Sequence, residues 1–276
     1  MKGAVVVRRV LIGAAVVAAV GAVVLVRFWG PREPEPAPDR AAESVAPGEL
    51  TAAAGQRVFL GHMSIGWNLL DGMTGLYADK GVPAPKVVQV ALDAPPPAMP
   101  AGQGAIVHAE IGTNGDPLGK IASFDTVMRG GMADAVDVAL VKLCFTDVTA
   151  GTDVDAVFAA YSATMDDLER DFPGVRFLHT TVPLTAAPSG IKQHLKVVVR
   201  GDDNAARERY NALVRDAYGD DDLFDIAAAE GTAADGVRTA SLATGWADGD
   251  REHLNQAGSA MLAARFLDVL TQTEDG

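Results

Sequence analysis

A serine near the start of the chain and an Asp-x-x-His group near its end have the types and spacing needed for covalent catalysis. Ser64 follows a short apolar run and is flanked by glycines at positions 61 and 66. Asp250 precedes His253 by three residues, just ahead of an apolar helical pattern. At that spacing the carboxylate can bond the imidazole Nδ1 and leave Nε2 free to take the serine proton. The chemistry indicated is attack by a serine hydroxyl on a carbonyl carbon.

Either half of this pattern alone has an ordinary structural explanation. A serine after a strand is commonly a turn or helix N-cap residue, and an Asp-x-x-His at a helix start commonly caps the helix. The combination favours chemistry, because Ser64 follows the first predicted strand and His253 precedes the last predicted helix. The N–H groups that open the helix after Ser64 are also suitable donors for a developing oxyanion.

The elements that must position these residues alternate along the chain from residue 57 onward. Strands are expected over residues 57–60, 86–92, 105–111, 136–145 and 175–182, with 223–228 as a short strand or extended segment. Helices are expected over residues 67–80, 118–132, 153–171, 202–218 and 255–271. This alternation predicts parallel strands with helices on both faces. We therefore expect a three-layer α/β/α sandwich with a mostly parallel five-stranded sheet, similar to that of flavodoxin.

Small and polar residues gather where the predicted strands end, which is where open parallel sheets form their sites. Besides Ser64, the candidates for oxyanion or substrate contacts are Gly112, Asn114, Thr146 and His62. The α/β-hydrolase elbow does not fit, because G-x-S-x-G requires a glycine at the position that His62 occupies.

Two charged residues are expected to have specific partners. Lys142 lies in the most apolar predicted strand, and a buried unpaired ammonium is unfavourable, so its side chain is expected to reach either a carboxylate, with Asp147 and Asp116 as candidates, or the end of the strand. Asp225 is expected to anchor the helix over residues 202–218, or Arg215 within it.

The histidines and the single cysteine do not suggest a metal site. The five histidines are scattered without ligand spacing, and Cys144 reads as a small buried hydrophobe. His194, with Lys192 and Lys196 beside it, is predicted to lie in an exposed loop bounded by glycine and proline. We expect neither a metal nor a cofactor.

The sequence resembles the SGNH (GDSL-type) hydrolase family over roughly residues 57–270. The blocks that carry the resemblance are residues 59–66 (FLGHMSIG) and 250–258 (DREHLNQAG), with 112–115 (GTNG) and 144–147 (CFTD) in the places of the middle blocks. The resemblance implies an α/β/α fold and hydrolysis of esters, often acetyl esters of carbohydrates, through an acyl-serine. By this resemblance Ser64 is the nucleophile, His253 the base and Asp250 its orienting partner.

The sequence departs from the family pattern at two places. The family usually reads Gly-Asp-Ser at the nucleophile, whereas His62 and Met63 separate Gly61 from Ser64 here. The third-block asparagine, an oxyanion donor in the family, is replaced by Thr146. Asn114 is the candidate for the missing amide, with the backbone N–H groups of Ser64 and Gly112 as the other donors.

The N-terminus has the pattern of a membrane anchor. Residues 10–26 are all apolar or glycine and give a helix of about 25 Å, slightly short of the ~30 Å hydrocarbon core. Lys2, Arg8 and Arg9 precede this run, which places the start in the cytoplasm and the body outside it. A cleaved signal peptide is the alternative, and the protein would then be secreted. The expected division is an anchor over 1–30, a Pro-rich linker over 31–50 and a catalytic-type domain over 51–276.

The net charge of the chain limits the classes of partner that it is expected to bind. The net charge is −13, and residues 41–276 contain 33 acidic and 17 basic groups. Such a body should be repelled by phosphate backbones, so nucleic acid is not an expected partner. The expected function is an extracytoplasmic serine esterase or O-deacylase acting on a small-molecule or glycan ester. The alternatives are an inactive glycan- or partner-binding domain and an acyltransferase that uses the same three residues.

Overall fold

The computed structural model describes residues 45–98, 103–233 and 235–272. At its centre lies one sheet of six strands in the order β2-β3-β1-β4-β5-β6, with every neighbouring pair parallel. The strands are β1 (Arg57–His62), β2 (Lys86–Gln89), β3 (Ala105–Glu110), β4 (Val138–Val141), β5 (Arg176–Thr180) and β6 (Leu223–Phe224). Because all strands run the same way, their carboxyl ends meet at one edge of the sheet.

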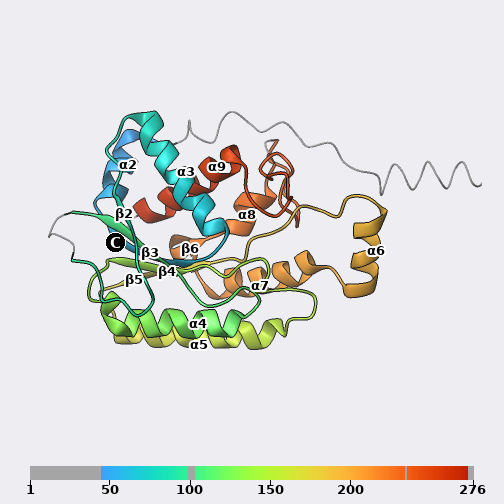
Figure 1. Cartoon of the computed structure of the whole chain (residues 1–276), viewed down its shortest axis with the longest axis horizontal. Helices are drawn as coiled ribbons and strands as arrows, with labels where there is room; N and C mark the ends of the chain where they lie inside the picture. The colour runs from blue at the N-terminus through green and yellow to red at the C-terminus, as the bar shows by residue number, and fades with distance from the viewer. Residues whose placement is uncertain (1–44, 99–102, 234, 273–276) are drawn as a thin grey trace, which may run out of the picture. The chain divides into compact units, whose positions relative to one another are not determined.

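Helices cover both faces of this sheet (Figure 1). One face carries α2 (Pro47–Ala54), α3 (Ile65–Lys80), α8 (Ile226–Gly231) and α9 (Gln256–Thr271). The other carries α4 (Pro117–Val127), which continues into a π-helical turn (Met128–Met132), then α5 (Val154–Asp171) and α7 (Asp203–Ala217). A short 3-10 turn (Asp220–Asp222) precedes β6. The remaining helix, α6 (Ile191–Arg200), belongs to the segment Ala187–Gly201, which is a unit apart from this body.

The burial of the strands explains their arrangement. All four residues of β4 are buried, as a strand covered on both faces by helices requires. In contrast, β2 lies at the edge of the sheet, and none of its residues is buried. Separate apolar cores fill the space on the two faces, one under α3 and α9 and one under α4 and α5.

Helices α3 and α9 are in unusually close contact, and this contact relates the two ends of the chain. A Cβ atom at Gly72 of α3 would lie 2.0 Å from the backbone oxygen of Ser259 in α9. Only a glycine allows the two backbones to approach so closely. Asn68 of α3 also donates to the backbone oxygen of Leu254 at 3.0 Å. The segment that precedes α9 is therefore fixed relative to the first turns of α3.

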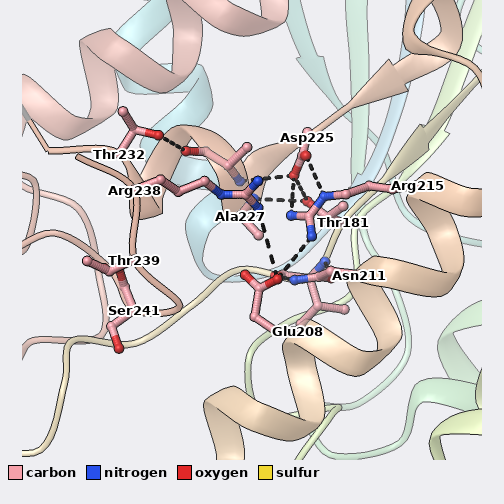
Figure 2. Close-up of polar contacts among 12 residues, drawn as sticks. Thr181, Glu208, Asn211, Arg215, Asp225, Ala227, Thr232, Arg238, Thr239 and Ser241 are labelled. Atoms are coloured by element: carbon pink, nitrogen blue, oxygen red, sulfur yellow. Dashed lines mark hydrogen bonds and ion pairs between the residues drawn. The ribbon is translucent and has the colours of Figure 1, made fainter. Parts of the chain in front are cut away.

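A polar network ties α7 to the carboxyl ends of β5 and β6 (Figure 2). Arg215 donates to both carboxylate oxygens of Asp225, at 2.6 and 2.9 Å, and to Glu208 at 2.9 Å. Thr181 donates to Asp225 at 2.9 Å and accepts from the N–H of Ala227. Burial alone would raise the pKa of Asp225, but the hydrogen bonds from Arg215 and its neighbours outweigh it and lower the pKa. The expected pairing of Asp225 with Arg215 is confirmed.

The predicted sheet was wrong in strand number, since five strands were expected and residues 223–228 were left open as a short strand or an extended segment. The sheet has six strands, because Leu223 and Phe224 pair with His179 and Thr180 as a short sixth strand. Strand β2 pairs with β3 and not with β1, so β3 lies between β2 and β1. The physical reason is the burial of the side chains. The residues of β2 are exposed or half-buried, which suits a strand at the edge of the sheet, whereas five of the six residues of β3 are buried between two neighbouring strands.

The predicted transmembrane helix is likewise not part of the described fold. Residues 10–26, where it was expected, lie outside the described residues, as does most of the predicted linker. No helix within residues 45–98, 103–233 and 235–272 is both long enough and apolar enough to cross a membrane. The first helix of the described body, α2, starts at Pro47, four residues before the expected domain start at residue 51. Its residues Leu50 and Ala53 are buried.

Two helices were missing from the sequence prediction after residue 182. Residues 226–231 form α8, and the segment around His194, predicted as a loop, forms the helix α6. Helix α6 buries none of its residues. It therefore lacks the contact with a core from which most helices in proteins gain their stability.

Candidate active site

Ser64 lies in the turn that joins β1 to α3, at the carboxyl edge of the sheet. Its backbone has φ 54° and ψ −112°, a conformation that a non-glycine residue adopts at a cost of roughly 1–3 kcal/mol. Ser64 is the N-cap residue of α3, yet its side chain makes no capping hydrogen bond. The hydroxyl is therefore available to a partner outside the helix, and capping does not explain the serine.

A buried lysine supports this turn from the neighbouring strand. Lys142 directly follows β4, and its Nζ donates to the backbone oxygen of Met63 at 2.7 Å. Burial lowers the pKa of the Lys142 ammonium. Of the two environments expected for Lys142, the end of the strand is the one found: its ammonium contacts a backbone carbonyl beside Ser64 and bonds neither Asp147 nor Asp116.

His253 joins Ser64 to Asp250 in a continuous chain of hydrogen bonds. The Oγ atom of Ser64 lies 2.6 Å from His253 Nε2, and Nδ1 of the same ring lies 2.5 Å from Asp250 Oδ2. The other carboxylate oxygen of Asp250 accepts from the N–H groups of Glu252 and His253, each at 2.9 Å. The structure thus brings Ser64 into contact with His253, 189 positions later in the sequence, and with Asp250 beyond it.

The ionisation of Asp250 decides which imidazole nitrogen carries the proton. Burial acts to raise the pKa of this carboxyl, but the two backbone N–H donors and the imidazole lower it to about 2. An ionised carboxylate can only accept hydrogen bonds, so Nδ1 of His253 carries the proton and Nε2 is the acceptor. In this tautomer the Ser64 hydroxyl donates to His253, which is the arrangement that activates a nucleophile.

The loop that carries Asp250 and His253 is held by its own backbone and by the cap of α9. Arg251 has φ 66°, a second non-glycine residue in the left-handed region, and its N–H donates to the oxygen of Asp248. Asn255 accepts from the N–H of Gly258 at 2.9 Å as the N-cap of α9, and its amide donates to two backbone oxygens of the loop. A Cβ at Gly258 would lie 2.5 Å from a backbone oxygen, so the glycine is needed for close packing here.

Phe145, in the loop after β4, packs against His253, and Arg207 packs against Phe145. The ring of Phe145 meets the His253 ring edge to face at a centroid distance of 5.7 Å. Arg207 of α7 lies over the same phenyl ring and donates to the backbone oxygens of Phe145 and Val148 at 2.9 and 3.1 Å. The helical spacing of Arg207 with Asn204 and Asn211 predicts a helix packed beside the site, whereas Phe145 was not predicted as a site residue. The signal for Phe145 was its position after the most apolar strand.

Two of the predicted oxyanion residues lie in the loop that follows β3. The N–H of Ile111 donates to the oxygen of His62, which continues the pairing of β3 with β1 toward Ser64. Gly112 comes next, with φ 59°, and a Cβ there would lie 2.6 Å from the side chain of Lys120. Asn114 is exposed, and its amide oxygen accepts from Lys120 Nζ at 2.8 Å. This contact orients the amide, so that its NH₂ group is the part left to donate to a ligand.

A fully buried ion pair joins this loop to the one after β4. Lys120 Nζ lies 2.7 Å from Asp147 Oδ2, and both side chains are completely buried. Asp147 also accepts from the N–H groups of Gly115 and Cys144, at 2.7 and 2.5 Å. Lys120 was missed by the sequence analysis, although a lysine at helical spacing from Phe124 on an apolar face was a usable signal.

The other two predicted site residues differ in position. Thr146 lies in the loop after β4, half-buried, with a hydroxyl that makes no hydrogen bond to the described residues. His62 is completely buried and bonds His108 at 3.0 Å, beneath the first turn of α3. Burial, with the nearby His108 and Lys142, lowers the pKa of His62 to about 3. The structure therefore places His62 in the support of the turn and not on a surface that a substrate can reach.

The described residues offer no evident metal centre. No group of three or more His, Cys, Asp or Glu side chains in residues 45–98, 103–233 and 235–272 is arranged to hold a metal ion.

Comparisons with known proteins give likenesses to solved structures alone. No protein-family model matches the sequence, and no curated protein matches it. Among solved structures, the chain is similar to a protein from Streptococcus pneumonia that is provisionally described as a platelet activating factor. The two share 13% sequence identity, and the match covers 80% of this chain and 90% of the other, with a TM-score of 0.49.

Proposed function

We propose that this protein is a serine esterase or O-deacylase, a divergent member of the SGNH family that hydrolyses small acyl esters through an acyl-serine intermediate. The single observation that carries the proposal is the 2.6 Å contact between Ser64 Oγ and His253 Nε2, with Asp250 at 2.5 Å from the other ring nitrogen. A serine hydroxyl is a weak nucleophile until a base lies within hydrogen-bond reach, and here the base is also oriented.

Acylation begins with transfer of the Ser64 proton to His253 Nε2 as Oγ attacks the ester carbonyl carbon. Asp250 remains ionised and stabilises the imidazolium that forms. The developing oxyanion lies at the carboxyl edge of the sheet, where the N–H groups of Ser64 and Gly112 and the amide of Asn114 are the proposed donors. The imidazolium then returns its proton to the departing alkoxide, which leaves as an alcohol.

Deacylation uses the same residues in the same order. Water takes the place of the alcohol, and His253 Nε2 accepts its proton while the water oxygen attacks the acyl carbon of the Ser64 ester. Collapse of the second tetrahedral intermediate releases the carboxylic acid and returns the proton to Ser64.

The charge of the protein favours a neutral substrate. With a net charge of −13, the field of the molecule disfavours polyanionic esters. Glycan esters and esters of small neutral alcohols are therefore the proposed substrates, with acetyl as the expected acyl group by resemblance to the family.

Labelling of the full chain with a fluorophosphonate tests the proposal. The reagent phosphonylates only an activated serine, so the wild type is expected to label, Ser64→Ala not at all, and His253→Gln at least a hundredfold more slowly. Ser162→Ala, which removes a partly exposed helix serine, is the matched control and should label like the wild type.

Three outcomes separate the competing functions. Absence of labelling in a folded wild-type chain refutes the esterase and favours a binding domain. Labelling that persists in Ser64→Ala assigns the reaction to another serine. Labelling together with acyl transfer to an added sugar, in preference to water, assigns acyl transfer by the same three residues.

A further inference from the structure

Helix α6 differs from every helix of the body in that it has no buried residue. It comprises the ten residues Ile191–Arg200, with the sequence IKQHLKVVVR. Each of these residues is exposed or half-exposed. A helix of this length is marginal in water on its own propensity, so it gains most of its stability from a surface that its apolar side packs against.

Four of the five apolar residues of α6 form one face, and Val197 lies apart from them. Ile191, Leu195, Val198 and Val199 are spaced i, i+4, i+7 and i+8, which places them on one side of a helix. Their exposed fractions are 52, 51, 74 and 79%, respectively. Nine large apolar residues of the described chain are exposed to a comparable degree, and four of them lie here. Val198 and Val199 are the two most exposed of the nine.

The polar side of α6 carries only positive charge. Lys192, Lys196 and Arg200 are spaced i, i+4 and i+8, so they form a row directly beside the apolar face. The helix contains no acidic residue, although the chain as a whole has a net charge of −13. Charges more than about 10 Å away are largely screened at physiological salt, so a ligand that contacts α6 meets a cationic surface.

A second copy of the chain is a poor occupant for this face. Ten helical residues span only about 15 Å, and a stable protein–protein interface buries roughly 1,200–2,000 Å². Two copies of α6 packed antiparallel through their apolar faces would also bring their rows of cations to the same side of the pair, which is unfavourable.

We propose that α6 binds the surface of an anionic lipid bilayer. An amphipathic helix with a cationic polar side lies in the plane of the interface, with its apolar face at the boundary of headgroups and acyl chains. In this arrangement Ile191, Leu195, Val198 and Val199 enter the bilayer surface, and the long side chains of Lys192, Lys196 and Arg200 reach the lipid phosphates. The proposal stands on α6 alone and is independent of the function proposed for Ser64.

An environment-sensitive dye on the apolar face tests this proposal in the full chain. The native Cys144 is buried, so a thiol introduced as Val198→Cys can be labelled selectively with the fluorophore NBD. Vesicles of phosphatidylcholine with 30% phosphatidylglycerol should shift the emission to the blue, and nitroxide-labelled lipids should quench it. Because the dye reports its own surroundings, lipid binding by another part of the chain does not produce this signal. Val237→Cys, labelled in the same way at another exposed valine, is the control and should stay unshifted.

Charge removal distinguishes lipid recognition from non-specific adhesion. Each cation near an anionic surface contributes about fivefold to partitioning, so the triple variant K192Q/K196Q/R200Q should bind about a hundredfold more weakly. The matched control is R170Q/R209Q/R265Q, which removes three other exposed cations and should bind like the wild type.

Each remaining outcome overturns the proposal. An equal blue shift with pure phosphatidylcholine vesicles refutes recognition of anionic lipid. A blue shift without vesicles that grows with protein concentration shows that a second copy covers the face. A blue shift without vesicles that is independent of concentration shows that another segment of the chain covers it, and absence of any shift refutes binding altogether.

Discussion

Replacement of Lys120 by methionine probes the buried ion pair that joins the two loops beside Ser64. The Lys120 ammonium contacts Asp147 at 2.7 Å and Asn114 at 2.8 Å, and neither side chain of the ion pair is exposed to solvent. Methionine preserves the unbranched apolar stem, which packs against Gly112. The substitution therefore removes the charge while it largely preserves the volume.

The expected loss of stability follows from the partner that remains. Breaking one side of a buried ion pair costs about 3–5 kcal/mol, because the other charge stays buried without compensation. Asp147 keeps the N–H groups of Gly115 and Cys144 as donors, so we expect the lower end, about 3 kcal/mol. That is a large part of the 5–15 kcal/mol by which domains are typically stable. Asn114 also loses the contact that orients its amide, so fluorophosphonate labelling of Ser64 should slow as well.

Urea denaturation, followed by fluorescence and circular dichroism, measures the change in the free energy of unfolding. Arg170→Met is the matched control, because Arg170 pairs with Asp167 at the surface, where a pair contributes less than about 1 kcal/mol. If Lys120→Met costs no more than this control, the ion pair does not hold the loops. If stability falls but labelling of Ser64 keeps its rate, Asn114 has no part in the site.

The remaining predictions concern the strained serine, the contact of α3 with α9, and a buried acid. Ser64→Gly should be about 1 kcal/mol more stable to urea than Ser64→Ala, since glycine tolerates φ 54°, and equal stability would refute the strain. Gly72→Ala should lower stability by several kcal/mol and slow labelling, because its Cβ would lie 2.0 Å from a backbone oxygen, whereas Gly75→Ala, with open space, should be neutral or stabilising. Burial, although opposed by the N–H of Leu184 and nearby cations, raises the pKa of Glu230 to about 8. The folded state therefore holds a proton that the unfolded state loses from about pH 4.5, and stability should fall by up to about 1.4 kcal/mol per pH unit toward pH 8. Glu230→Gln should remove that slope in urea titrations at several pH values, and an unchanged slope would assign it to other groups.

The pattern of apolar runs was sufficient to predict most elements of the body. Runs such as residues 136–145 and 105–111 contain strands, because a strand covered by helices on both faces of the sheet buries consecutive apolar residues. Their ends were less certain, and β4 spans only Val138–Val141. The order of the strands could not be predicted from the sequence. Whether β2 pairs with β1 or with β3 depends on how the strands and helices pack in three dimensions, and no local pattern of residues records that choice.

The candidate site was predictable in its residue types but not in its contacts. Ser64, Asp250 and His253 could be chosen because their chemistry and their positions beside predicted elements are visible in the sequence. His62 could not be assigned in this way, since a histidine next to a serine can point to solvent or into the core, and here the first turn of α3 covers it.

The sequence by itself determined an alternating α/β chain with an acidic body, a serine after its first strand and a histidine before its last helix. These features depend on residue type and local spacing, which act over a few residues. Only the tertiary structure decided that Lys120 pairs with Asp147, that Lys142 supports the serine turn and that α6 keeps an apolar face exposed. The first two contacts join residues 27 and 79 positions apart in the chain, and the exposure of α6 depends on what the rest of the fold leaves uncovered, so local spacing alone could not predict them.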